Sequence, residues 1–303
     1  MQHGYTYAAA LAASQRINWK IEDIIGGDKR LDFTKPFLPN SLAGVAQLHF
    51  LNAGEKLILN QIRGHNYLYL FGLVEEFILP FVLNHAMPVL AEDDTRTRAL
   101  LQFASEEAKH IHLFKIFRNA FIEGFGESCD VIGPPQEIAK AVLAHHPLSV
   151  ALLILHIEWM TQGHYVESIR DDDALDPTFT SLLKHHWMEE AQHARLDTLM
   201  VQQIAAGCTP DEIAKAIDGY LELIAMLDGG LRQQVVLDLT AWARRTRRVL
   251  GEAQHREALG VQHQAMRWTF IGSGMSHRNF AAVIQAIHAP SLPRIEAMVP
   301  GFS

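Results

Sequence analysis

Two short segments of the chain pair a carboxylate with an imidazole at the same spacing. Residues 106–110 (EEAKH) and 189–193 (EEAQH) each place a glutamate three positions before a histidine. On a helix such residues lie on one face, about 60° apart around the axis. Iron and manganese both accept carboxylate oxygen and imidazole nitrogen as ligands. Each segment therefore predicts one half of a metal site, built from Glu107 with His110 and from Glu190 with His193.

A lone glutamate precedes each of these segments on the helix before it. Glu76 lies 31 residues before Glu107, and Glu158 lies 32 residues before Glu190. Two antiparallel helices joined by a short connection would bring each lone glutamate opposite its partner segment. The resulting set of ligands is that of the ferritin-like di-iron and di-manganese carboxylate bundles. Glu75 competes with Glu76 because both have apolar neighbours, and the interval favours Glu76 only mildly.

Four further residues lie close enough along the helices to join or support this set. His186 precedes Glu190 by four residues and shares its face, so it is a candidate third histidine ligand. Its alternative role is that of a core histidine hydrogen-bonded to a neighbour. Glu106, Glu189 and Asp197 are candidates to orient the metal-bound imidazoles, and each could equally be a surface carboxylate. The predicted metal ligands are Glu76, Glu107, His110, Glu158, His186, Glu190 and His193.

A third copy of the pattern is set aside. Glu252 and His255 have the same spacing, with Glu222 upstream at a comparable interval. Their helix carries five arginines, however, as a solvent-facing helix does. The flanks of the chosen ligands are strongly apolar, and carboxylates buried there without cations would be costly.

The elements that must position these residues are helices. Apolar residues recur at three- and four-residue spacing along most of the chain, and strand-like alternation is scarce. The predicted fold is all-α: a ferritin-like four-helix bundle with additional packing helices, forming one domain over residues 1–303. Asp176-Pro177 and Thr209-Pro210 mark two helix starts. The metal-binding core spans about residues 45–206, with long helices predicted over 45–87, 93–124, 147–170 and 178–206.

Accessory helices are predicted around this core, at 136–144, 210–227, 231–256 and 277–288, with the C-terminal set spanning about residues 210–290. Gly229-Gly230 is read as a break, and Pro80 as a kink or an early end of the first long helix. The first forty residues and the last dozen are predicted to be irregular.

Composition narrows the class of protein. A formal charge of −8 over 303 residues argues against a nucleic-acid interface. Two cysteines, Cys129 and Cys208, suit a reducing compartment rather than a disulfide framework. Charges interrupt the apolar helices and the start lacks a signal-peptide pattern, so no membrane span is expected. We expect a soluble, cytoplasmic protein.

The order and spacing of these residues resemble the ferritin-like di-iron oxygenase superfamily. The arrangement of His186, Glu190 and His193 is most similar to the p-aminobenzoate N-oxygenase family of arylamine oxygenases. The resemblance covers about residues 60–205 and implies two irons held by four glutamates and three histidines, with manganese accepted by the same ligands. It also implies O2, a small organic substrate such as an aromatic amine, and a homodimer. Since no Gly-x-Gly-x-x-Gly motif follows a strand, we expect electrons from an external donor. Ribonucleotide reductase small subunits are a poorer match, because Phe114 stands where they carry a radical-storing tyrosine.

Two other classes of function are kept as alternatives. One is a ferritin-like protein that oxidises and handles iron without an organic substrate. The other is a metal-free helical interaction module. A substrate-sized apolar cavity beside the metals would favour the oxygenase, a polar channel would favour iron handling, and indifference to chelators would favour the module.

Overall fold

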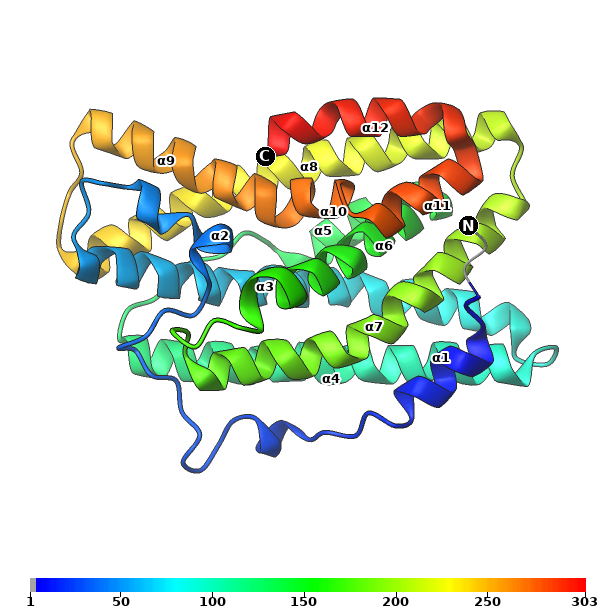
Figure 1. Cartoon of the computed structure of the whole chain (residues 1–303), viewed down its shortest axis with the longest axis horizontal. Helices are drawn as coiled ribbons and strands as arrows, with labels where there is room; N and C mark the ends of the chain where they lie inside the picture. Colours follow the sequence, from blue (N-terminus) through cyan, green and yellow to red (C-terminus); the bar gives the residue numbers. More distant parts are fainter. Residues whose placement is uncertain (1–3) are drawn as a thin grey trace.

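The computed structural model describes residues 4–303, and its regular elements are helices, which confirms the all-α prediction. Four long helices carry the candidate ligands. They are α3 (Ala53–Ala86), α4 (Asp94–Phe125), α6 (Pro147–His164) and α7 (Pro177–Ala206). These helices follow the long axis of the molecule (Figure 1).

The four helices form two antiparallel pairs. Helix α3 packs against α4 through a short connection that contains η3 (Met87–Val89), and α6 packs against α7. A long crossover containing α5 (Pro135–Leu143) joins the pairs, and α4 also contacts α7. Two pairs joined by one long crossover make the ferritin-like topology.

Local signals explain where the long helices begin. The Asn52 side chain accepts from the backbone N–H of Glu55, whose carboxylate accepts from the Asn52 N–H, so α3 starts at a capping box. Asp176 caps α7 ahead of Pro177, and Thr209 caps α8 (Pro210–Thr246) ahead of Pro210, as the sequence predicts. A five-residue π-helix, η4 (Tyr165–Ile169), ends the α6 segment.

The remaining elements wrap the bundle. Helix α1 (Tyr7–Ser14) packs across α4 and α7, while α8 packs against α3 and α6 (Figure 1). The others are η1 (Ile21–Asp23), α2 (Asn40–Ala43), η2 (Val45–Gln47), α9 (Glu252–Arg267), η5 (Trp268–Gly272), α10 (Ser273–Met275), α11 (Arg278–His288), η6 (Ala289–Ser291), α12 (Leu292–Met298) and η7 (Val299–Phe302). The buried apolar side chains of all these layers join in one cluster.

Three expectations about these elements are wrong. Helix α8 runs without interruption through Gly229-Gly230, because burial of Leu223, Leu231 and Val235 against the bundle outweighs the poor helix propensity of glycine. Helix α3 continues six residues past Pro80, so the early end considered for it is wrong. The two ends of the chain are not irregular throughout, since α1 and α2 lie in the first part and α12 with η7 in the last.

Among residues 4–303, one helical stretch is long and apolar enough to cross a membrane by length and composition. It covers residues 53–89, and 67% of its most apolar window is buried inside the protein. That burial is typical of the core helix of a soluble bundle, so the stretch is weak evidence for a membrane span.

Candidate metal centre

The two paired segments meet face to face at the centre of the bundle. Glu107 and His110 project from α4, and His186, Glu190 and His193 project from α7. All five side chains are buried, with at most 3% of each residue exposed. Spacings of three and four residues keep each helix's contribution on one face, which is why the sequence places them together.

Potential ligand atoms gather in two overlapping groups. The first contains Glu75, His110, His186 and Glu190, and the second contains Glu107, His110, Glu190 and His193, with all atoms of a group within 4.8 Å of one another. His110 and Glu190 belong to both groups. The centre therefore has the layout of two adjacent cation sites that share ligands.

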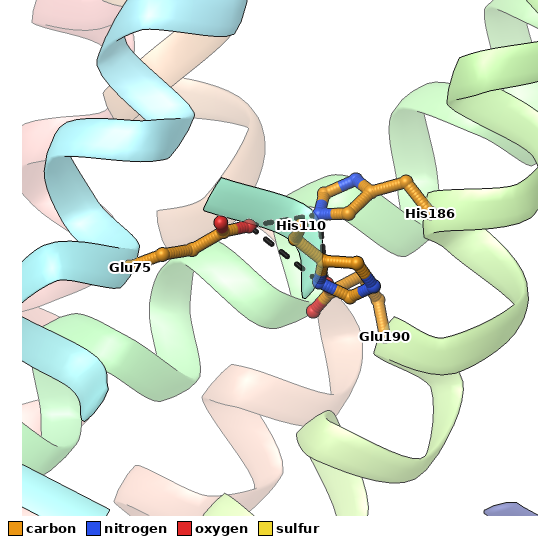
Figure 2. Close-up of side chains that lie close together, drawn as sticks. All are labelled: Glu75, His110, His186 and Glu190. Atoms are coloured by element: carbon orange, nitrogen blue, oxygen red, sulfur yellow. Dashed lines mark hydrogen bonds and ion pairs between the residues drawn. The ribbon is translucent and has the colours of Figure 1, made fainter. Parts of the chain in front are cut away.

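Glu75, His110 and Glu190 converge on the first group from three different helices. Glu75 reaches in from α3 toward α7, as Figure 2 shows. His186 Nε2 lies 3.1 Å from Glu75 Oε1 and 2.7 Å from Glu190 Oε1. His110 Nδ1 lies 3.0 Å from that same Glu190 oxygen.

The second group uses the other oxygen of Glu190. His193 Nδ1 lies 3.1 Å from Glu190 Oε2 and 2.8 Å from Glu107 Oε1. Oε1 of Glu190 thus faces the first group and its Oε2 faces the second, so this carboxylate lies between the two groups. In this position one carboxylate can neutralise two cations at once.

The first glutamate of the cluster is Glu75, and the preference for Glu76 is corrected. The Glu75 side chain is 4% exposed and points at His186, whereas the Glu76 side chain is 29% exposed and lies 3.5 Å from Lys115 Nζ. Adjacent residues on a helix point about 100° apart, so only one of the two can face the bundle axis.

Glu158 lies beside the cluster but in neither group of ligand atoms. Its carboxyl group is buried and hydrogen-bonded to Glu190, and its Oε2 atom has no hydrogen-bond partner. Burial, together with the charge and hydrogen bond of Glu190, raises the pKa of Glu158 well above its usual value. Glu158 therefore contacts the cluster through Glu190, and the raised pKa favours its uncharged form.

Glu106 and Glu189 directly precede the motif residues Glu107 and Glu190. Each of them contacts the histidine of the other motif. His110 Nε2 lies 2.7 Å from Glu189 Oε2, and His193 Nε2 lies 2.9 Å from Glu106 Oε2. Lys109 Nζ lies within 2.5 Å of the other Glu189 oxygen, and Ser14 and Gln102 donate to Glu106. Both glutamates thus hold an imidazole in one orientation, as proposed for them from the sequence.

Asp197 does not have the orienting role considered for it. The residue is buried, yet neither carboxylate oxygen has a hydrogen-bond partner. Burial, offset in part by the nearby His193, raises the pKa of Asp197 well above its usual value, and the charges of Glu107 and Glu190 raise it further. Asp197 therefore adds an acidic group beside the cluster rather than an acceptor for an imidazole.

The contacts of the His110 and His193 Nε2 atoms with Glu189 and Glu106 determine which ring nitrogen faces the cluster. If the Nε2–H groups of His110 and His193 donate to Glu189 and Glu106, the Nδ1 atoms are acceptors. His110 Nδ1 then faces Glu190 Oε1 at 3.0 Å, and His193 Nδ1 faces Glu107 Oε1 at 2.8 Å. Acceptors facing acceptors need protons or cations between them, and the mixed oxygen and nitrogen set fits iron or manganese.

The pKa values of the cluster show the same demand for positive charge. Burial, with the charge of Glu107 nearby, raises the pKa of Glu75 to about 8. Burial lowers the pKa of His110, but its bonds to Glu189 and Glu190 outweigh this effect and raise it to about 10. Without cations, the carboxylates hold or attract protons; bound cations would take the place of these protons.

Aromatic rings surround the imidazoles on the sides away from the carboxylates. Phe103 stacks on His193 with ring centroids 4.0 Å apart, and Phe114 lies edge-on to His186 at 5.0 Å. Phe71 also meets His186 edge-on, at 5.4 Å, and Trp19 lies parallel to His110 at 6.0 Å. These rings keep water away from the ligand atoms and strengthen electrostatic interactions there.

An apolar cavity of about 380 Å³ adjoins this aromatic layer. It lies between α3, α5, α6 and α8, and the Phe71 that touches His186 also lines it. Other wall residues are Val74, Phe77, Leu153, Ile157, Leu223 and Phe270. The sequence did not reveal this cavity, because it arises where four helices and a loop fail to fill the space between them.

The third copy of the motif lies on the surface. Glu252 is exposed and pairs with Arg256 four residues later, and His255 is also exposed. Its upstream Glu222 is exposed as well. The helix expected over 231–256 is wrong, however: Glu252, His255 and Arg256 lie on α9, while Arg244 and Arg245 end α8 and Arg247 and Arg248 lie in the connection.

Comparison with other proteins yields structural likeness alone. No protein-family model matches the chain, and no curated protein matches it. A mutant of an R2-like ligand-binding oxidase with an aerobically reconstituted Fe/Fe cofactor is 16% identical, covers 92% of this chain and 93% of its own, and gives a TM-score of 0.48. The R2-like ligand-binding oxidase with an aerobically reconstituted Mn/Fe cofactor is 15% identical, with 92% and 94% coverage and the same TM-score. At these TM-scores the likeness carries no weight for function.

Proposed function

We propose that this chain is a non-haem di-iron oxygenase that uses O2 to oxygenate a small organic substrate, an arylamine nitrogen being the atom oxidised. The observation that carries the proposal is the buried convergence of Glu75, Glu107, Glu190 and three histidines, with acceptor atoms facing one another. Such a centre is costly without cations and well matched to two of them.

The proposed ligands are Glu75, Glu107, His110, Glu158, His186, Glu190 and His193. Glu190 would bridge the two positions, since its two oxygens face different groups. His186 lies only in the first group and His193 only in the second, so His110 would be the histidine within reach of both positions. Iron bound here would supply O2 activation, and manganese would be accepted by the same ligands.

The chain's own residues would position and shield this chemistry. Glu189 and Glu106 hold His110 and His193 with their Nδ1 lone pairs directed inward. Phe71, Phe103 and Phe114 exclude water from the histidine side of the centre. Electrons for O2 reduction would come from an external donor.

The apolar cavity favours an oxygenase over an iron-handling protein. Iron ions need a polar route, whereas the space that shares Phe71 with the centre is lined almost entirely by carbon. Its volume of about 380 Å³ is within the range of small-molecule sites. An organic substrate is the occupant that such a cavity suits.

Single-turnover oxygenation tests the proposal. The protein would be loaded anaerobically with two ferrous ions and then mixed with an arylamine, a reductant and isotopically labelled O2. The product would be analysed by mass spectrometry. We expect one labelled oxygen on the nitrogen, and no product with the Glu107→Ala/Glu190→Ala variant. Continued iron uptake with growth of a ferric mineral and no organic product would instead identify an iron-handling protein.

A further inference from the structure

The cavity beside the centre has room for more than one aromatic ring. A cavity of about 150 Å³ is enough to hold benzene, and this one measures about 380 Å³. Its walls come from α3, α5, α6 and α8, together with Phe270 from η5 and the loop around Gly133. The volume therefore corresponds to a two-ring molecule or one of similar size.

The charge on the cavity wall is negative. Glu137, exposed in the first turn of α5, is the one ionisable side chain among the lining residues, and Gln233 on α8 is the other polar one. Within the described residues 4–303, no lysine, arginine or histidine lines the cavity. An anionic group on a ligand would therefore meet no positive charge on this wall, and the amide of Gln233 is the one uncharged polar side chain that it could contact.

Gly230 supplies a part of the wall that has no side chain. It lies within α8, where glycine is disfavoured, and a Cβ atom built on it would come 3.4 Å from Ile132 Cδ1, another lining residue. The neighbouring Gly229 is exposed, and a Cβ there would meet nothing within 4 Å. Two adjacent glycines thus offer one position that faces the cavity and one that faces away.

We propose that this cavity is the substrate site and that it selects uncharged, acid-free arylamines of about two rings, excluding carboxylates and other anions. The apolar part of the wall gives a buried carboxylate no hydrogen-bond partner, the wall has no cation to neutralise it, and Glu137 repels it at the polar part. A neutral aromatic ring, by contrast, is favoured by the apolar lining residues, among them Phe71, Phe77 and Leu223. That the bound molecule is the substrate rests on the proposed function, but the selectivity does not.

A matched pair of ligands tests the selectivity. Calorimetric titration would compare 4-aminobiphenyl with its analogue that carries a carboxylate on the second ring, using both metal-free and iron-loaded chain. We expect the neutral amine to bind at least tenfold more tightly than the acid in both forms. Equal or tighter binding of the acid, or no binding of either ligand, would overturn the proposal.

Three variants locate the binding. Gly230→Leu should fill the cavity and abolish binding, whereas Gly229→Leu should leave it unchanged. Glu137→Lys should raise the affinity for the acid at least tenfold, because it replaces repulsion by attraction. If Gly230→Leu binds like the wild type while its circular dichroism is unchanged, the ligand lies elsewhere and the proposal fails.

Failure of this inference and failure of the proposed function remain distinguishable. Ligand binding is measured on metal-free chain, so it does not depend on whether the centre takes up iron. A chain that binds the neutral amine and no metal would retain the binding site and lose the oxygenase. A chain that binds two irons but prefers the acid would retain the metal centre and lose the selectivity.

Discussion

The Nε2 atom of His110 lies 2.7 Å from the Oε2 atom of Glu189, a bond between the histidine of one motif and the glutamate that begins the other. The reciprocal bond joins His193 to Glu106 at 2.9 Å. The two motifs therefore orient each other's imidazoles across the interface of α4 and α7. This explains why each motif begins with two consecutive glutamates, one directed at the centre and one at the opposite histidine.

The orienting bond should be measurable in metal affinity. Glu189→Gln keeps the size of the side chain but removes the charge that His110 and Lys109 face. Loss of such a partner lowers metal affinity about 10–100-fold, and we expect a decrease of that order in anaerobic ferrous titrations. Glu76→Gln, which changes a partly exposed neighbour of the proposed ligand Glu75, is the control and should bind as the wild type does. Unchanged affinity in Glu189→Gln would refute the orienting role.

The choice between Glu75 and Glu76 has a direct test. Glu75→Ala removes a buried carboxylate that lies 3.1 Å from His186, and Glu76→Ala removes a partly exposed one that pairs with Lys115. We expect Glu75→Ala to lose a large part of the bound metal and Glu76→Ala to keep it, as measured after gel filtration. Equal losses in both variants would contradict the geometry described for α3.

Bound metal should stabilise the fold. The centre keeps several buried carboxylate oxygens without hydrogen-bond partners, among them Oε2 of Glu75 and Oε2 of Glu107, and cations would relieve the repulsion between these carboxylates. A ligand present at a hundred times its dissociation constant adds about 2.7 kcal/mol of stability. We therefore expect ferrous or manganous ions to raise the melting temperature of the wild type, and a chelator to reverse the rise. The Glu107→Ala/Glu190→Ala variant should show neither response; a similar rise in both proteins would indicate binding elsewhere.

His65 should make the fold sensitive to acid. It is fully buried against Phe121 without a hydrogen-bond partner, and burial, together with the charge of Arg118, lowers its pKa to about 3. Below pH 6.5 the unfolded chain takes up a proton that the folded chain does not, so stability is lost as the pH falls from 6.5 toward 3. The loss from this residue is about 2 kcal/mol at pH 5.

Replacing His65 by leucine should remove that loss. Between pH 7 and pH 5, the free energy of unfolding of His65→Leu should fall less than that of the wild type by about 2 kcal/mol, as measured by urea denaturation. His255→Gln, at an exposed position, is the control for removing a histidine. Parallel pH profiles for wild type and His65→Leu would show that His65 is protonated in the folded state.

The helical periodicity of the sequence was sufficient to place most of the centre. Glu107, His110, Glu190 and His193 follow from spacing within single helices, where each residue's direction is fixed by its neighbours. The choice of Glu75 over Glu76 depends on the phase of α3 relative to α4 across a turn. One residue there changes the direction by about 100°, and no local pattern in the sequence determines it.

Features that depend on packing between elements could not be predicted from the sequence. Gly229-Gly230 reads as a break by propensity, yet the apolar residues around it keep α8 continuous. The role of Gly230 as a cavity wall depends on Ile132, almost a hundred residues away in the chain. Likewise, the bonds of Glu106 and Glu189 to the opposite histidines follow only from the way α4 and α7 face each other.

The most direct test of the central claim is the metal content of the purified chain. Plasma mass spectrometry would be applied to the wild type and to the Glu107→Ala/Glu190→Ala variant after anaerobic reconstitution with iron and manganese. The proposed ligand set predicts about two metal ions per wild-type chain and nearly none in the variant. No bound metal in either protein would contradict the account and leave a helical protein without a metal centre.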